Sequence, residues 1–480
     1  MKGGKVGKSL PDDIMDQREL LEKQVKIEEF DNDKSLLDYR FMGTNIPMWM
    51  FVRIDIFRKF LYYYFGKFNT PLRGNIHKPC YKDFTKYNPY FTLPKNVIYV
   101  NFWDYLMTED KDGFISHNFI KDYVKLVDKT SVIITGNSEI YDTSKIYYPN
   151  WKRQDAIDKL CKAHKVIDEK DKVVAKKFIN YLKEECPCEI DLNFGKNILA
   201  KISYISEYFN AYVQAWKTYL KITRPKLVIL GWAYCMGCSV SACVLACKEL
   251  GIKTAEIQHG YVGKGHSAYY LSDLVLHDSD CIKILPDYFL TLGDYWKRNI
   301  KIPSELITIG THRKYKDVSK TNNQDILICP TLPKEGTEEI LKYILKSINN
   351  NVKVYLRPHP SVNPKPYEDM LKSLNMYTNV FLANEKEMEY YLRKCAYVIT
   401  DGSTVVYEAL YCGNVVYVCK DEMFYESGIH NIEDKVNTFT NVEEFKEVWD
   451  KRINIRPKAY NEFYDMNYKK KYREFVYKII

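Results

Sequence analysis

Short apolar runs alternate with longer segments of helical pattern, and this alternation constrains the fold of the chain more than any other feature. The clearest unit is residues 224–260 (RPKLVILGW…CKELGIKTAEIQHG), where an apolar run ends at Gly231, a helical segment ends at Gly251, and a second run follows. Strand, helix and strand at this spacing are typical of βαβ units with parallel strands. The sequence therefore predicts an α/β protein built on parallel sheets.

A polar interruption divides this alternation into two parts. Residues 312–325 (HRKYKDVSKTNNQD) are charged and lack apolar periodicity, so they are predicted to be a linker between two domains. The expected strands are 96–100, 131–135, 226–230 and 254–257 before the linker, and 326–329, 352–356, 380–382, 397–400 and 415–418 after it. The expected helices include 196–222, 233–250, 338–348 and 404–411. We expect a polar tail at 1–36, a first domain at 37–318, a second domain at 319–455 and an amphipathic terminal helix at 456–480.

The composition argues against several classes of protein. No apolar run approaches the ~18 residues that a membrane span needs, and residues 1–13 (MKGGKVGKSLPDD) contain no apolar signal core. The 13 cysteines are irregularly spaced, which favours reduced thiols and a cytoplasmic location. The net charge of +9 is mild and fits an anionic lipid, a nucleic acid or a phosphorylated ligand equally well. Because recognisable nucleic-acid-binding motifs are absent, we expect no nucleic-acid partner.

Two segments have two interpretations each. Residues 46–68 (IPMWMFVRIDIFRKFLYYYFGKF) are aromatic, basic and amphipathic, which suits either a helix at a membrane surface or a helix packed on the core. Cys235, Cys238, Cys243 and Cys247 lie along an expected helix in an apolar run. Buried thiols at a helix–sheet contact are favoured there over a zinc site, whose cysteine pairs usually lie on turns. We therefore predict no metal site.

Three short motifs that follow expected strands carry the candidate chemistry. The first begins at His259 and Gly260, after the strand at 254–257, and continues into a loop that contains Gly263. Glycines allow a ligand to approach the backbone closely and permit tight turns. His259 is either a functional group, acting as a base or as a donor to phosphate, or a structural histidine that supports the turn.

The second motif is RPHP at residues 357–360, directly after the strand at 352–356. Its prolines stiffen the loop, which limits the entropy lost when a ligand orders it. Arg357 and His359 together offer donors for a phosphate or a nucleobase edge. The alternative is a rigid turn with a surface histidine.

The third motif is TDGST at residues 400–404, between an expected strand and a helix. Ser403 or Thr404 can cap that helix, and a helix N-terminus with hydroxyls and glycine binds anions, although capping without a ligand is the simpler interpretation. Glu408 lies one turn further along, where it can accept hydrogen bonds from a ribose or sugar hydroxyl. The remaining candidates beside this site are Gly402, Lys334 and Thr337.

The order and spacing of these motifs resemble a known group of enzymes. RPHP, followed by ITDGSTVVYEALYCGNVVYV, is similar to the His-Pro and Ser/Thr motifs of bacterial surface-polysaccharide glycosyltransferases. That group includes capsule polymerases, teichoic-acid-type glycerophosphotransferases, and sialyl- and Kdo-transferases. AEIQHGYVGKGHSAYY, LPDYFLTLGDYWKRN and ITIGTHRKY are similar to the end of the first domain of such proteins. The resemblance covers about residues 226–420, and the first 225 residues match no family.

The resemblance implies the GT-B fold, in which two Rossmann-like domains face a central cleft and a C-terminal helix crosses back to the first domain. It also implies a nucleotide-activated sugar, with a CMP-linked donor favoured, held mainly by the second domain. His359 would contact the donor phosphate or nucleotide, and Ser403 and Thr404 would hold phosphate at the helix N-terminus. This chain has Arg-Pro-His-Pro at the position where that group of enzymes more often has Lys-x-His-Pro. The acceptor, a growing cell-surface glycan or a lipid-linked molecule, would be recognised by the unmatched first part.

Glycosyl transfer requires charge stabilisation on the departing phosphate and a base for the acceptor hydroxyl. Because no Asp-x-Asp motif lies in a suitable loop, we expect no metal and no other cofactor, with Arg357 and the groups around it stabilising the charge. The candidates for the base are His259, Glu139 and Asp104. The alternatives are a CDP-glycerol-type glycerophosphotransferase, a nucleotide-sugar 2-epimerase, and a non-catalytic subunit for envelope assembly. We expect the protein to be cytoplasmic and to be held at the inner face of the membrane by its basic aromatic segments.

Overall fold

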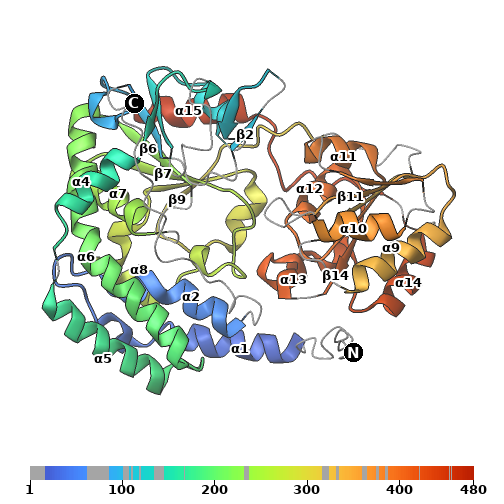
Figure 1. Ribbon diagram of the computed structural model, residues 1–480, viewed down its shortest axis with the longest axis horizontal. Coiled ribbons are helices and arrows are strands. Elements are labelled where there is room, and N and C mark those ends of the chain that lie inside the picture. The colour runs from blue at the N-terminus through green and yellow to red at the C-terminus, as the bar shows by residue number, and fades with distance from the viewer. Residues whose placement is uncertain are drawn as a thin grey trace, which may run out of the picture.

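The chain forms two lobes, each built around a parallel sheet, in the computed structural model (Figure 1). The structure describes residues 17–61, 86–100, 107–109, 112–117, 120–134, 145–166, 168–231, 237–315, 324–330, 335–358, 365–374, 378–383, 387–420, 422–452, 455 and 457–480. Every strand expected from the sequence is confirmed, with ends that differ by at most two residues. The α/β prediction is therefore confirmed as well.

The first lobe contains seven parallel strands among its described residues, in the order β5-β4-β1-β6-β7-β8-β9. Their bounds are β1 Val97–Val100, β4 Thr130–Ile134, β5 Trp151–Arg153, β6 Leu227–Leu230, β7 Lys253–Ile257, β8 Tyr288–Thr291 and β9 Glu305–Thr308. β1 lies between β4 and β6, with Val97 opposite Thr130 on one side and Leu227 on the other. A small antiparallel pair, β2 (Met107–Glu109) and β3 (Ile115–His117), lies beside this sheet.

The two faces of the first sheet pack against different helices, as the alternation of side chains along a strand requires. On one face, Ile98 and Val228 pack into the larger core, together with six helices. On the other face, Val97 and Leu227 pack into a smaller core, together with the terminal helix. The helices of the larger core are α1 Gln17–Phe30, α2 Trp49–Leu61, α4 Asp155–Ala163, α5 Glu169–Glu185, α6 Leu192–Thr223 and α7 Cys238–Glu249. α7 buries Cys243 and Cys247, which confirms the prediction of buried thiols for the described part of that run.

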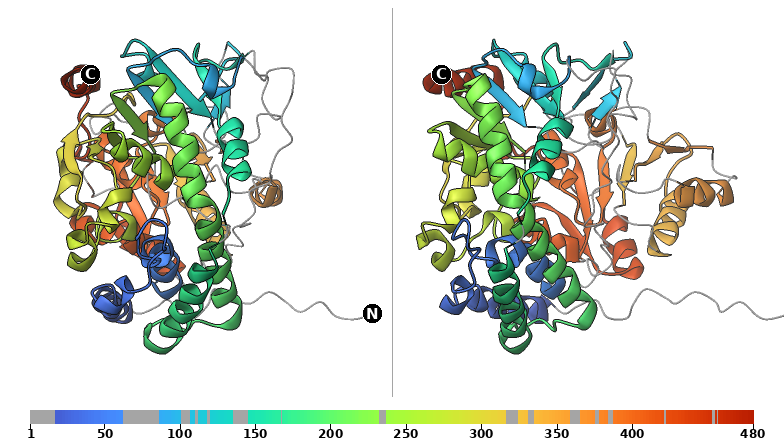
Figure 2. Two further views of the ribbon diagram at one scale, coloured as in Figure 1. Left: turned by 90° about the vertical axis from the view of Figure 1, so that its left-hand side faces the viewer. Right: turned by 60° about the vertical axis from the view of Figure 1, so that its left-hand side comes forward.

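The terminal helix, α15 (Tyr468–Ile479), follows the second lobe in sequence but packs on the first (Figures 1 and 2). Its Tyr472 hydroxyl lies 2.5 Å from the Tyr99 hydroxyl in the middle of β1, and Phe475 packs edge-on against Tyr288 of β8. The expected terminal helix that crosses back to the first domain is therefore confirmed.

The second lobe contains six parallel strands among its described residues, in the order β12-β11-β10-β13-β14-β15. Their bounds are β10 Ile326–Cys329, β11 Val354–Leu356, β12 Val380–Leu382, β13 Tyr397–Thr400, β14 Val415–Cys419 and β15 Asn437–Phe439. The helices around this sheet are α9 Glu335–Ser347, α10 Lys365–Ser373, α11 Met388–Lys394, α12 Val405–Cys412, α13 Glu422–Glu426 and α14 Val442–Asp450.

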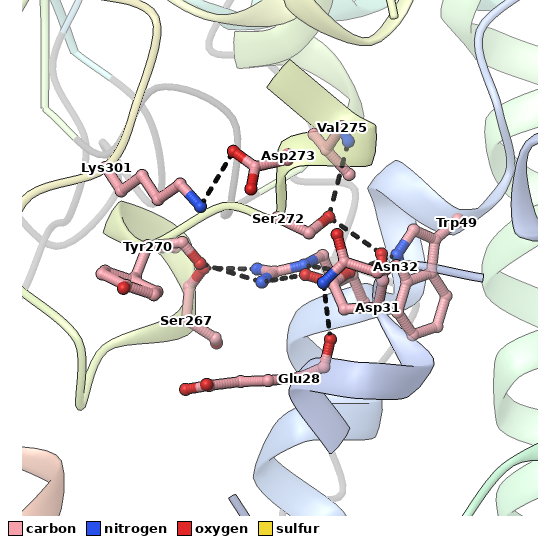
Figure 3. Close-up of polar contacts among 12 residues, drawn as sticks. Glu28, Asp31, Asn32, Trp49, Ser267, Tyr270, Ser272, Asp273, Val275 and Lys301 are labelled. Carbon is pink, nitrogen blue, oxygen red and sulfur yellow. Dashed lines mark hydrogen bonds and ion pairs between the residues drawn. The ribbon is translucent and has the colours of Figure 1, made fainter. Parts of the chain in front are cut away.

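The first described residues fall within the expected polar tail, yet they pack on the first lobe. α1 fully buries Ile27, and the Asp31 that follows it forms a buried ion pair with Arg53 of α2. Phe30 of the same helix is buried as well, and an ion pair such as that of Asp31 (Figure 3) cannot be seen in helical periodicity.

α2 lies in the segment that suited either a membrane surface or the core. Trp49, Val52 and Ile56 are completely buried inside the protein, so the core interpretation is confirmed for residues 49–61. Across the described residues, no helix is both long and apolar enough to cross a membrane.

Candidate functional site

The loop after β7 and the loop after β13 meet where the two lobes touch. A Cβ atom placed on Gly260 would lie 3.9 Å from Thr404 Cγ2 at the start of α12. One residue further on, the ring of Tyr261 stacks on Tyr407 of α12 with centroids 6.2 Å apart. Parallel strands deliver ligand-binding loops at their carboxyl ends, and here two such loops from different sheets adjoin. Two of the three sequence motifs are therefore brought together.

His259 lies at the end of a buried polar chain on the first-lobe side. The Tyr269 hydroxyl donates to Glu256 Oε1 of β7 at 2.6 Å and lies 3.4 Å from His259 Nδ1. Glu256 is 2% exposed and Tyr269 is equally buried, whereas His259 is half-buried. The carboxylate therefore fixes the phenol, and the phenol orients the imidazole toward the junction of the lobes.

This chain of contacts suits one tautomer of His259. The phenol has one proton, and the short distance to Glu256 assigns that proton to the carboxylate. The phenol oxygen can then accept from His259 in the tautomer that carries its proton on Nδ1, and in that tautomer Nε2 has the basic lone pair. A histidine in this state accepts a proton at Nε2.

A second histidine and an arginine act on His259 from the same side. The His266 ring lies 6.4 Å from the His259 ring, centroid to centroid. Burial lowers the pKa of His259 well below its ordinary value, and repulsion from a protonated His266 and from Arg58 acts in the same direction. Burial and Arg58 lower the pKa of His266 to about 3. Both imidazoles are therefore neutral at pH 7, as a base requires.

The second-lobe side of the junction is the N-terminus of α12. Gly402 has φ +90°, a conformation that glycine adopts without strain, and it turns the chain from β13 into the helix. Thr404 is the N-cap residue, but its side chain accepts no capping hydrogen bond, and Ser403 Oγ accepts from Val405 N–H at a long 3.5 Å. Because these hydroxyls do little capping and are half-buried, the arrangement suits an anion at the positive end of the helix.

Arg357 follows β11 and is held by its own lobe. Its Nη1 donates to the Ala383 carbonyl oxygen at 2.7 Å, and its guanidinium lies 5.3 Å from the centroid of the Tyr391 ring. These contacts fix the guanidinium at the carboxyl edge of the second sheet. Its positive charge therefore adds to the field at that edge.

Glu408 forms an ion pair that the sequence did not indicate. Its Oε1 accepts from Arg313 Nη1 at 2.5 Å, and Glu389 lies 3.9 Å from the same guanidinium. Burial raises the pKa of Glu408, although Arg313 acts to lower it. Arg313 lies in the segment between the lobes, so Glu408 is placed to hold that connection, and a sugar hydroxyl would have to compete with the guanidinium for it.

The remaining candidates lie further away or outside the described residues. Gly263 has φ +155° and packs against Tyr261 and Asn299, which makes it part of the turn rather than of an open surface. Thr337 lies half-buried in the first turn of α9. The candidates outside the described residues are Asp104, Glu139, Lys334 and His359.

The structure adds residues that sequence reasoning missed. Glu256 and Tyr269 could have been found from the sequence. Glu256 is a carboxylate within an apolar strand, Tyr269 follows His259 closely, and both are buried near this candidate base. Arg58 lies in the basic aromatic segment 46–68 and Arg313 in the segment ITIGTHRKY, but neither segment indicated which side chain its arginine would lie near. The described residues contain no group of three or more His, Cys, Asp or Glu side chains arranged to hold a metal ion.

No protein-family model matches this chain, and no curated protein matches it. Solved structures do match. A UDP-N-acetylglucosamine 2-epimerase is 14% identical with a TM-score of 0.47, over 80% of this chain and 96% of that one. The UDP-GlcNAc 2-epimerase from Neisseria meningitidis bound to UDP-GlcNAc is 12% identical with a TM-score of 0.42, over 80% and 100%.

A lipopolysaccharide outer-core galactosyltransferase is also similar, at 10% identity with a TM-score of 0.41, over 80% of this chain and 100% of that one. This chain has two parallel α/β sheets whose carboxyl-end loops adjoin, and its C-terminal helix returns to pack on the first sheet. The chain has the GT-B fold.

Proposed function

We propose that this chain is a glycosyltransferase that moves a sugar from a nucleotide-activated donor, with a CMP-linked donor favoured, onto a growing glycan or a lipid-linked acceptor without a metal ion. The single observation behind the proposal is the adjacency of the His259–Gly260 loop and the N-terminus of α12. One side supplies a neutral imidazole, and the other supplies an anion site. These are the two groups that glycosyl transfer needs.

The proposed reaction proceeds between these two sides. The donor phosphate lies at the N-terminus of α12, where Ser403, Thr404 and the helix dipole stabilise the negative charge that builds as the bond from sugar to phosphate breaks. His259 Nε2 takes the proton of the acceptor hydroxyl, whose oxygen forms the new bond to the sugar. Tyr269 and Glu256 keep His259 in the required tautomer and orientation.

A thermal-shift panel with CMP, CDP, UDP and GDP, with EDTA present, tests the donor half of the proposal. A ligand that binds only the folded state stabilises it by about 2.7 kcal/mol at a concentration of 100 Kd. We expect one nucleotide to raise the Tm of the wild type and of Ser373→Ala, a control on an exposed serine of α10. The double variant Ser403→Ala/Thr404→Val should lose most of that shift.

The outcome also separates the alternatives. A response to CDP with transfer from CDP-glycerol would indicate a glycerophosphotransferase, and conversion of a UDP-sugar without an acceptor would indicate an epimerase. The absence of any nucleotide response would overturn the proposal in favour of a non-catalytic subunit.

A further inference from the structure

The amino edge of the first sheet, where its strands begin, carries a row of lysines. Four neighbouring strands, β4, β1, β6 and β7, begin side by side there. The Asn96 N–H donates to the Lys129 carbonyl oxygen at 2.9 Å, and the Lys226 N–H donates to the Asn96 carbonyl oxygen at 3.0 Å. The Lys253 N–H donates to the Lys226 carbonyl oxygen at 3.2 Å. Because neighbouring strands lie about 4.8 Å apart, these positions form one row about 14 Å long.

The end of α6 adds further cations to this row. The Lys95 N–H donates to the carbonyl oxygen of Thr223, the last residue of α6, at 2.9 Å. Burial lowers the pKa of Lys152 on β5, and repulsion from Lys95 acts in the same direction. Five cations at this edge are exposed and Lys95 is half-buried. We call these six residues the basic edge; they are Lys95, Lys129, Lys221, Arg224, Lys226 and Lys253.

The protein does not balance the positive charge of the basic edge. Among the described residues, none of its six cations takes part in an ion pair, whereas Lys217 of α6 pairs with Glu249 of α7. The three residues before each of the four strands include one carboxylate, that of Asp128. The next two strands, β8 and β9, begin beside Asp287 and at Glu305, so the basic edge ends at β7.

Exposed apolar side chains lie against the same edge. The 3-10 turn η4 (Pro89–Phe91) packs on α6, where the Tyr90 hydroxyl donates to the Ala215 carbonyl oxygen at 3.3 Å. Thr92 is buried, whereas Phe91 and Leu93 on either side of it are 63% and 78% exposed. Single exposed apolar residues are common. These two, however, alternate with an inward position on a segment that is fixed to α6, so their exposure is a property of the fold.

Ile222 connects the apolar side chains with the cations. It is 38% exposed and directly precedes Thr223, whose carbonyl oxygen accepts from Lys95, two residues after Leu93. A nucleic acid or an acidic protein would contact the cations but has no acyl chains to cover the apolar side chains. A bilayer with anionic lipids presents phosphates above acyl chains and so matches both kinds of group.

We propose that the first lobe docks through its basic edge on a membrane surface that contains anionic lipids, with Phe91, Leu93 and Ile222 entering the boundary between headgroups and acyl chains. The six cations would contact the lipid phosphates. The segment 46–68, which suited a membrane surface in the sequence, does not provide this contact over residues 49–61, because their helix packs into the core.

This docking leaves the junction of the lobes accessible. β7 begins at Lys253, in the basic edge, and His259 follows the other end of the strand. Six residues of extended chain reach up to about 20 Å, so the two residues lie at opposite edges of the sheet. The proposal needs neither a nucleotide nor the transferase reaction, and it can hold or fail independently of the proposed function.

Vesicle flotation of the full chain tests the proposal. We expect binding to phosphatidylcholine vesicles that contain about 30% phosphatidylglycerol, with affinity for pure phosphatidylcholine vesicles at least tenfold weaker. The binding should weaken as the salt concentration rises, because salt screens exposed charges. Hydrogen exchange, followed by mass spectrometry, should slow in peptides that contain residues 89–95 and 221–226 when anionic vesicles are added, and should not change in peptides from α5.

Two double variants test the two kinds of contact separately. Lys226→Gln/Lys253→Gln should weaken binding to anionic vesicles at least tenfold, because it removes two unpaired charges from the row. Phe91→Ser/Leu93→Ser should also weaken it at least tenfold, because it removes the side chains that enter the bilayer. All four side chains are exposed, so both variants should keep the Tm of the wild type.

Lys176→Gln/Lys177→Gln is the matched control, because it removes the same charge from exposed lysines of α5, which packs on the N-terminal half of α6, away from the basic edge (Figure 1). This variant should bind like the wild type. Absence of binding to anionic vesicles, equal binding to both kinds of vesicle, or binding that neither double variant of the basic edge weakens would overturn the proposal. Tighter binding of duplex DNA or of polyglutamate than of anionic vesicles would also overturn it, because the partner would then be a different polyanion.

Discussion

Removal of the Asp31 carboxylate should destabilise the first lobe far more than removal of a surface carboxylate on the same layer of helices. Asp31 and Arg53 are 2% and 1% exposed, and the carboxylate accepts from Trp49 as well as from the guanidinium. Asp31→Asn removes the countercharge of the buried guanidinium and one of the two oxygens that accept from it. Breaking a buried pair in this way costs about 3–5 kcal/mol.

Asp55→Asn is the control, because Asp55 also forms an ion pair at 2.6 Å, with Lys201, but is 37% exposed. Exposed pairs contribute about 0–1 kcal/mol. At roughly 2 °C per kcal/mol for a lobe of this size, Asp31→Asn should lower the Tm by about 6–10 °C and Asp55→Asn by no more than about 2 °C.

Differential scanning calorimetry and urea unfolding followed by tryptophan fluorescence measure these changes. The double variant Asp31→Asn/Arg53→Met should cost less than the sum of its single changes by about 1–3 kcal/mol, because its members share one interaction. Equal losses for Asp31→Asn and Asp55→Asn, or additive losses in the double variant, would refute the claim that this ion pair holds α1 and α2 in place.

Three further predictions follow from buried groups. Burial lowers the pKa of His117 to about 4, so the unfolded chain takes up a proton below pH 6.5 that the folded chain does not. This group alone should lower stability by about 3 kcal/mol between pH 6.5 and pH 4, and His117→Gln should make the Tm less dependent on pH over that interval, while the part due to His259 and His266 remains. Tyr269→Phe removes the hydroxyl beside His259 Nδ1 and should lower the population of the Nδ1–H tautomer, which is measured from the ¹⁵N chemical shifts of the imidazole. An unchanged tautomer ratio would contradict the chain of contacts from Glu256 through Tyr269 to His259. Tyr472→Ala should cost about 3–5 kcal/mol in urea unfolding, whereas Tyr477→Ala, 53% exposed on the same helix, should cost no more than about 0.5 kcal/mol.

The sequence predicted most of the continuously buried strands, although β3 and β8, which are buried over all or most of their length, were not among those expected. Val398 and Ile399 of β13, for example, lie in a run in which every residue is buried on both faces, and such runs are visible in a single sequence. β9 was missed because its residues are half-buried or exposed at the edge of the sheet, so that no apolar run marks it. An edge strand is held by hydrogen bonds to its one neighbouring strand, and the apolar pattern of a sequence does not reveal those bonds.

The polar contacts of the candidate site were less accessible to sequence reasoning. Arg313 and Glu408 are 95 positions apart, and Arg53 reaches a carbonyl 217 positions away. A guanidinium selects its partner by distance and direction in the folded chain, and many acidic residues in the sequence suit it equally. Glu408 therefore looked available for a ligand hydroxyl, whereas the fold gives it a cation.

The meeting of the His259 and Ser403 loops was predictable because it depends on topology rather than on pairing of particular side chains. Each loop follows a strand near the middle of a parallel sheet, and the carboxyl ends of both sheets are turned toward each other. α15 constrains this orientation, since Tyr472 anchors the end of the chain to β1 after the second lobe is complete. If the lobes were joined by the 312–325 segment alone, their relative orientation would be free, and Gly260 and Thr404 would not be held in contact. The stacking of Tyr261 on Tyr407 supplies a second constraint at the junction itself. A ligand that needs both loops therefore meets them already adjacent, and loosening either constraint should weaken its binding without changing a residue that touches it.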